Sequence, residues 1–301
     1  MGQLRSIRLP GGGLLAYSEP AWVKRILPSD SWKKKVIRFL SWLRILDLVG
    51  FRFDGRTSLD GHSFDLFELT RQLPGAAKNA TLAAIFVNSR RRSPRVYAWL
   101  QSGGEDFFLK IGTASDEAAF RNEIEVTAQL SVPPGFRVMR PIELLNVDGL
   151  FLLLSQGISP AILDTMTRME PRQVFARLAA QSATPTGPFR GPVHSDLASN
   201  NVFAYGDEIL LVDWEFAALS GPDYCDLVGL AAEIAAEQTN TGGNVEATCA
   251  YLRQETGYNL EDDAIIECLE FLATRGNRRA QHILAGVASR GTTTDGSSIC
   301  I

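Results

Sequence analysis

The chain has 301 residues, 45% of them hydrophobic, and a formal net charge of −4 at pH 7. This length can bury a full core, and no apolar run is long enough to cross a membrane as a helix. The four cysteines show no Cys-x-x-Cys or metal-ligand spacing, so we expect reduced thiols in a cytoplasmic protein without structural zinc. We expect no nucleic-acid partner.

Residues 1–78 are predicted to form an N-terminal extension. Ser31 is a candidate N-cap for a helix over residues 32–46, in which apolar residues share one face and Lys34 and Arg38 lie opposite. A basic amphipathic helix of this kind could contact a membrane surface. Packing against its own protein is the favoured interpretation.

Residues 79–157 are predicted to form a small antiparallel sheet with one helix. The expected strands cover residues 82–87, 95–100, 107–111, 140–145 and 150–154. The helix is expected over residues 116–130, with Ser115 as its N-cap. Lys110 lies on the third strand and Glu123 in the helix.

The loop between the first two strands contains Arg90 and Arg91 but no glycine. Arginine side chains can bind phosphates as charged, bidentate donors, so one interpretation is an arginine lid over a triphosphate. The other is a solvated basic hairpin tip. The sequence does not decide between them.

The most informative motif begins at His194 and contains Asp196 and, five residues later, Asn201. A predicted β-hairpin over residues 202–212 returns the chain to this loop and brings Asp213 with it. Phosphoryl transfer needs a carboxylate to orient the attacking hydroxyl and oxygen ligands for Mg²⁺ on the nucleotide. Asp196, Asn201 and Asp213 offer that set.

These motifs resemble the kinase-like phosphotransferase family that includes aminoglycoside phosphotransferases and choline kinases. The family pattern is His-Gly-Asp-Leu-x-x-x-Asn, followed by an apolar run that ends in Asp-Trp-Glu; Ser195 replaces the glycine here. The resemblance implies one role for each matching residue: catalytic base for Asp196, bracing of the loop for His194, Mg²⁺ ligation for Asn201 and Asp213, and anchoring of the loop backbone for Asp226.

The resemblance also implies a site for ATP or GTP in residues 79–157. Lys110 would hold phosphates with Glu123 as its partner, and Ser155-Gln156-Gly157 would be the hinge whose backbone binds the base. Glu125 is the less favoured partner of Lys110, because a shift of two positions turns a side chain away from the Glu123 face. The alternative for Lys110 and Glu123 is a solvated surface pair.

Residues 158–301 are predicted to form a mainly helical lobe. Helices are expected over residues 172–181, 227–238, 245–255, 260–275 and 278–288. Residues 196–270 carry sixteen Asp and Glu against Arg253 alone, whereas residues 1–56 carry eleven Lys and Arg against four acidic residues. The acidic region could concentrate a cationic acceptor, or it could merely balance the basic N-terminus.

The sequence therefore predicts an α+β, bilobal, protein-kinase-like fold with an N-terminal extension. The predicted activity is ATP-dependent, Mg²⁺-requiring transfer of the γ-phosphoryl group to a hydroxyl of a small molecule, such as a cationic amino-alcohol or an aminoglycoside-like acceptor. One alternative is a catalytically silent kinase-like binding protein, and another is a kinase for a protein or a membrane-associated glycan or lipid. The sequence names neither the acceptor nor the oligomeric state.

Overall fold

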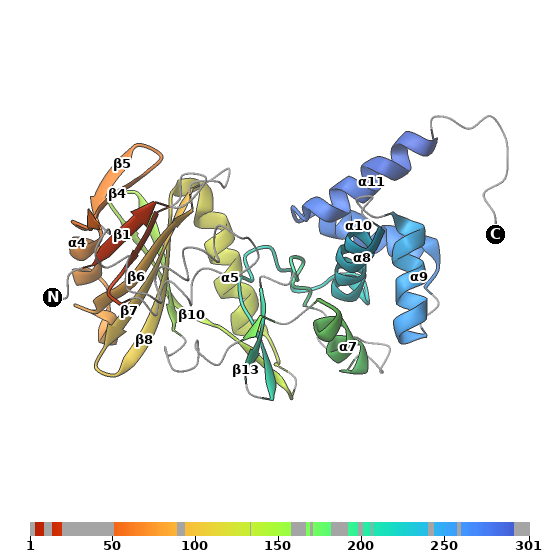
Figure 1. The fold of residues 1–301 in the computed structure, drawn as a ribbon, viewed down its shortest axis with the longest axis horizontal. Coiled ribbons are helices and arrows are strands. Elements are labelled where there is room, and N and C mark those ends of the chain that lie inside the picture. The colour runs from red at the N-terminus through yellow and green to blue at the C-terminus, as the bar shows by residue number, and fades with distance from the viewer. Residues whose placement is uncertain are drawn as a thin grey trace. The chain divides into compact units, whose positions relative to one another are not determined.

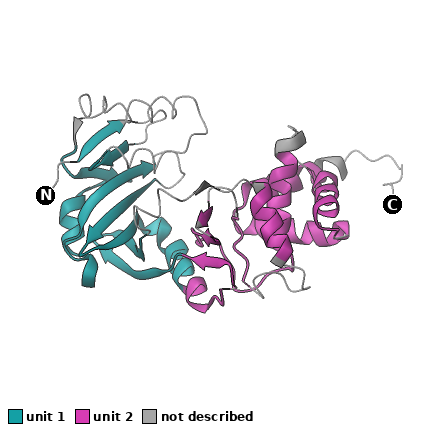
Figure 2. Cartoon of the chain, turned by 60° about the horizontal axis from the view of Figure 1, so that its bottom comes forward, with its two compact units in different colours: residues 1–124, 139–165 teal, residues 125–138, 166–301 magenta. Residues whose placement is uncertain are grey.

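The computed structural model describes most of the chain outside residues 20–50 and the C-terminal tail. The described ranges are 4–8, 14–19, 51–88, 94–132, 134–157, 167–168, 171–181, 192–197, 201–205, 207–239, 244–257 and 260–291. The chain forms two compact units, shown in Figure 2. Unit 1 contains residues 1–124 and 139–165, and unit 2 contains residues 125–138 and 166–301.

The described part of unit 1 is built on an antiparallel sheet with the strand order β10-β11-β8-β7-β6-β2-β1-β3 (Figure 1). The five strands expected from the sequence are its first five: β10 (Pro141–Val147), β11 (Leu150–Gln156), β8 (Glu105–Gly112), β7 (Arg95–Ser102) and β6 (Thr81–Asn88). Three further strands extend the sheet beyond β6: β2 (Leu14–Tyr17), β1 (Arg5–Arg8) and β3 (Phe51–Arg52).

The two faces of this sheet carry different side chains. Because side chains alternate along a strand, Leu109 and Ile111 of β8 point to one face and Lys110 points to the other. The first face is covered by residues 53–77, which form β4 (Arg56–Leu59), β5 (His62–Asp65), α4 (Leu66–Arg71) and η1 (Gly75–Ala77). The described parts of the predicted extension are therefore part of the core of unit 1.

Helix α5 (Glu117–Gln129) packs on the opposite face, where its buried Phe120 contacts Phe151 and Leu153 of β11. The short turn η2 (Ala114–Asp116) leads from β8 into this helix. Lys110 and α5 consequently share one face of the sheet.

Unit 2 combines a small sheet with a helical core. The sheet order is β12-β13-β14-β9, formed by Thr167–Arg168, Val202–Tyr205, Glu208–Leu211 and Phe136–Val138. The helices are α7 (Pro171–Gln181), α8 (Cys225–Thr239), α9 (Val245–Thr256), α10 (Asp262–Thr274) and α11 (Arg278–Gly291). The predicted fold class is confirmed: an antiparallel sheet unit with a helix, joined to a mainly helical unit.

Several predicted features lie outside the described residues, namely the amphipathic helix over residues 32–46 and both Arg90 and Arg91 of the basic loop. The division at residues 78 and 157 stays a prediction. No helix in the described ranges has the length and apolar character needed to cross a membrane.

Candidate functional site

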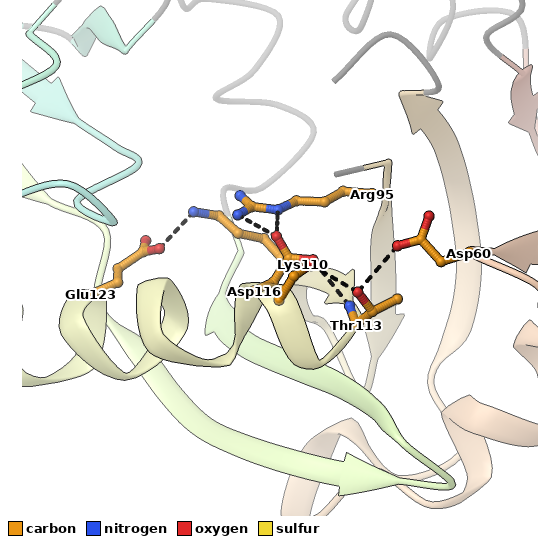
Figure 3. A network of polar contacts seen from close by, with 7 residues as sticks. Asp60, Arg95, Lys110, Thr113, Asp116 and Glu123 are labelled. Carbon is orange, nitrogen blue, oxygen red and sulfur yellow. Dashed lines mark hydrogen bonds and ion pairs between the residues drawn. The ribbon is translucent and has the colours of Figure 1, made fainter. Parts of the chain in front are cut away.

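Lys110 and Glu123 form a buried ion pair in unit 1 (Figure 3). Lys110 Nζ donates to Glu123 Oε2 at 2.7 Å, and the two side chains are 3% and 0% exposed. Glu125, the less favoured partner, is exposed. Because each buried charge depends on the other, loss of one partner alone would cost about 3–5 kcal/mol of stability.

The segment predicted as the hinge is tied to the start of β8. Ser155 and Gln156 end β11 opposite Phe108 and Phe107, and Gly157 N donates to Asp106 O at 2.7 Å. A Cβ at Gly157 would lie 2.6 Å from this backbone, so only glycine fits. Binding of a base by this segment stays a prediction.

In unit 2, Asp226 holds the loop that contains His194 and Ser195. It lies in the first turn of α8, and its two carboxylate oxygens accept hydrogen bonds from His194 N at 2.9 Å and Ser195 N at 3.0 Å. Burial raises the pKa of Asp226, whereas His194 and the two backbone N–H groups act in the opposite direction. The loop backbone is thus fixed by a carboxylate that lies 31 residues downstream of Ser195.

His194 connects this loop to the segment that contains Asp213. Its ring is buried, with Nε2 3.0 Å from Val212 O and the ring centroid 4.5 Å from that of Trp214. Since a carbonyl oxygen only accepts, Nε2 carries the hydrogen and donates. The chain therefore fixes the imidazole by its contacts with residues 212–214.

Asp196 and Asn201 are brought together on the loop. Asn201 Nδ2 donates to Asp196 O at 2.8 Å and to Asp196 Oδ2 at 3.1 Å, and Val212 N donates to Asn201 O at 3.1 Å. Burial raises the pKa of Asp196, and the carboxylates of Asp213 and Glu215 raise it further, while His194 and Asn201 lower it. Asp196, Asn201 and Asp213 thus lie in one electrostatically connected group.

The oxygen atoms of this group are of the type that Mg²⁺ prefers. Carboxylate and amide oxygens suit a hard cation, which usually takes one or two protein ligands together with substrate phosphates and water. Within the described ranges, no group of three or more His, Cys, Asp or Glu is arranged to hold a metal ion by itself. Ligation of Mg²⁺ by Asn201 and Asp213 stays a prediction.

Three of the six described non-glycine residues with a positive φ lie in or next to these segments. Ser195, Asp213 and Tyr224 have φ angles of 66°, 68° and 63°, in the left-handed region that disfavours residues with a Cβ. Such conformations persist where the surrounding contacts enforce them, and they are frequent at functional sites.

One residue of the loop's surroundings was missed in the sequence. Asn277 Nδ2 donates to Ser195 O at 3.1 Å, while its Oδ1 accepts from Ala280 N at 3.1 Å in the first turn of α11. Its place before a predicted helix marks it as a candidate N-cap. The sequence contains no sign of the contact between Asn277 and Ser195, which lie 82 positions apart.

No family model matches this sequence, and no curated protein matches it. In structure, the chain is similar to a thermostable mutant of aminoglycoside phosphotransferase APH(4)-Ia in its apo form, with 15% identity and a TM-score of 0.40 over 69% of this chain and 96% of that chain. A ternary complex of another mutant of that enzyme with ADP and hygromycin B has 14% identity and a TM-score of 0.36, over 68% and 94% of the two chains.

The chain is also similar to choline kinase LicA from Streptococcus pneumoniae, with 12% identity and a TM-score of 0.37 over 64% of this chain and 90% of that chain. These proteins are of the phosphotransferase kind that the sequence motifs resemble. Identities of 12–15% and TM-scores below 0.5 transfer neither an activity nor a substrate to this chain.

Proposed function

We propose that this protein transfers the γ-phosphoryl group of ATP or GTP to a hydroxyl group of a small molecule. The observation that carries the proposal is the group in unit 2, in which Asn201 holds Asp196 and Asp213 lies close enough to affect its pKa. Phosphoryl transfer depends mainly on positioning and charge neutralisation, and this group supplies a fixed carboxylate beside further oxygen ligands.

Asp196 would accept the proton of the acceptor hydroxyl or orient that hydroxyl for attack. The raised pKa of Asp196 makes it a better proton acceptor than an ordinary surface carboxylate. Asn201 and Asp213 would hold Mg²⁺, which supplies charge neutralisation on the nucleotide phosphates when bound. Asp226 and His194 would keep the loop in place for this chemistry through their contacts with the loop backbone and with Val212 O.

In unit 1, Lys110 would bind nucleotide phosphates and Glu123 would keep its ammonium group in place. Residues 155–157 would bind the base through their backbone. For the acceptor, we propose a cationic amino-alcohol or an aminoglycoside-like molecule, because residues 196–270 carry a large excess of Asp and Glu that attracts cations.

The test is Mg²⁺-dependent ATP binding by calorimetry, together with slow ATP hydrolysis, on the full chain. Asp213→Ala should lose metal-dependent binding, whereas Asp196→Asn should bind MgATP without turnover. Asp207→Asn is the matched control, because Asp207 is an exposed carboxylate at the turn between β13 and β14. Absence of nucleotide binding by folded wild-type protein would refute the proposal and favour a catalytically silent binding protein.

A further inference from the structure

A second buried ion pair lies beside Lys110 and Glu123 (Figure 3). Arg95, the first residue of β7, donates from Nε and Nη2 to Asp116 Oδ1, at 2.7 Å in both cases. The Arg95 side chain is 6% exposed and that of Asp116 2%. Neither residue has a role in the proposed chemistry.

Asp116 is held from several directions at the start of α5. Its Oδ2 accepts from Thr113 N at 3.0 Å, and Thr113 Oγ1 donates to Asp60 Oδ2 at 3.3 Å. A Cβ on Gly112 would lie 2.5 Å from Asp116 Oδ2, so the space around the carboxylate is filled. The carboxylate is consequently held between the Arg95 guanidinium group and Thr113 N.

Phe120 lies between the two ion pairs. Asp116, Phe120 and Glu123 are spaced i, i+4 and i+7, so they lie on one face of the helical segment. Cζ of Arg95 is 5.1 Å from the centroid of the Phe120 ring, which also packs against β11. The sheet thus contacts this face through an ion pair at each end and an aromatic ring between them.

We propose that Arg95 and Asp116 are positioning residues for Lys110: they fix α5 on the sheet, and α5 in turn holds Glu123 against the Lys110 ammonium group. A helix held by one contact can pivot about it, whereas contacts seven residues apart, about 10 Å along the axis, prevent this motion. The importance of this positioning for activity rests on the proposed function, in which Lys110 binds nucleotide phosphates.

The coupling can be measured without any assay of activity, because a buried, ion-paired lysine reacts slowly with acylating reagents. The experiment measures the rate at which acetic anhydride acylates Lys110 in the full chain, by peptide mass spectrometry. The test variant R95M/D116L replaces the pair by apolar side chains of similar size. It also removes the acceptor of the Thr113 N–H group. We expect Lys110 to react at least tenfold faster in this variant than in wild type.

The matched control is R121M/E117L. Arg121 and Glu117 form an ion pair at 2.7 Å in the same helix, but their side chains are 67% and 35% exposed. The control should change the Lys110 rate less than twofold. Circular dichroism establishes that both variants are folded at the temperature of labelling, so that a faster rate reports a local change.

A Lys110 rate within twofold of wild type in folded R95M/D116L would overturn the proposal. If that variant does not fold, R95K replaces it, because lysine keeps the charge but lacks the two-donor contact with Oδ1. Lys110 should be acylated at least threefold faster in R95K than in wild type, and an unchanged rate would again overturn the proposal.

Protection by MgATP separates this proposal from the proposed binding of nucleotide phosphates by Lys110. If MgATP protects Lys110 in wild type, the phosphate-binding role is supported; if it does not, while R95M/D116L reacts faster, the positioning role is retained and the nucleotide assignment fails.

Discussion

Replacing Ser195 by glycine should stabilise the protein, although Ser195 adjoins the proposed catalytic Asp196. The φ angle of Ser195 is 66°, where a residue with a Cβ pays about 1–2 kcal/mol relative to the right-handed region. Glycine removes this cost but loses about 0.4–1 kcal/mol through the greater freedom of its unfolded chain. The free energy of unfolding of S195G should therefore exceed that of S195A by about 1 kcal/mol.

The serine hydroxyl contributes a second effect that both variants share. Ser195 Oγ is buried and has no hydrogen-bond partner among the described residues. Burial of an unpaired hydroxyl costs about 1–3 kcal/mol. We therefore expect S195A to gain about 1 kcal/mol over wild type and S195G about 2 kcal/mol, and each kcal/mol raises the Tm of a domain of 150–250 residues by about 2–4 °C.

Ser155 provides the matched control. Its Oγ is also buried without a partner among the described residues, but Ser155 lies in strand β11 and does not have a positive φ. Glycine inside a strand costs about 0.5–1 kcal/mol relative to alanine, so S155A should be more stable than S155G. Urea unfolding of the four variants, followed by circular dichroism, compares their stabilities. Glycine should be more stable than alanine at position 195 and less stable at position 155. The same order at both positions would refute the reasoning from backbone strain.

Three further predictions concern other contacts of the described structure. Gly112→Ala should destabilise the protein by about 1–3 kcal/mol in urea unfolding, because its Cβ would overlap the Asp116 carboxylate; unchanged stability would show that the carboxylate can move. Asn277→Ala should lower the free energy of unfolding by about 2 kcal/mol in the same assay, because it removes both the cap of α11 and the hydrogen bond to Ser195 O. Asn277→Asp should restore the cap but not the hydrogen bond to Ser195 O. Burial and the Asp262 carboxylate raise the pKa of the Cys249 thiol to about 12. Asp262→Asn should therefore increase the rate at which Cys249 reacts with a disulfide reagent at pH 8 by roughly tenfold. Adding Cys249→Ser should abolish this increase.

The parts of the fold that the sequence predicted have local signals. Alternation of apolar residues predicts β7 and β8, because adjacent strands of a hairpin need no distant partner to define them. Strands β1 and β2 are only four residues each; they pair with each other, and also with β3 and β6 respectively. Four residues are too few for alternation to identify a strand, and the pairing of β2 with the distant β6 has no signal in the residues of β2.

The candidate site shows the same difference. Asp196 and Asn201 are five residues apart on one loop, so their contact follows from spacing. The contacts of Asn277 with Ser195 and of Arg95 with Asp116 depend instead on how helices and strands pack. The resemblance implied the contacts of Glu123 with Lys110 and of Asp226 with the loop backbone, which the structure contains. No motif marked the contacts of Asn277 with Ser195 and of Arg95 with Asp116.

The strain in unit 2 serves the contact between Asp226 and the loop. Successive backbone N–H groups converge on one anion when a left-handed residue turns the chain, and Ser195 supplies both the left-handed conformation and one of these N–H groups. Tyr224, also left-handed, accepts through its carbonyl from Val228 N where the chain turns into α8. S195G retains the N–H group and the accessible φ, so it should keep the Asp226 contact while losing strain.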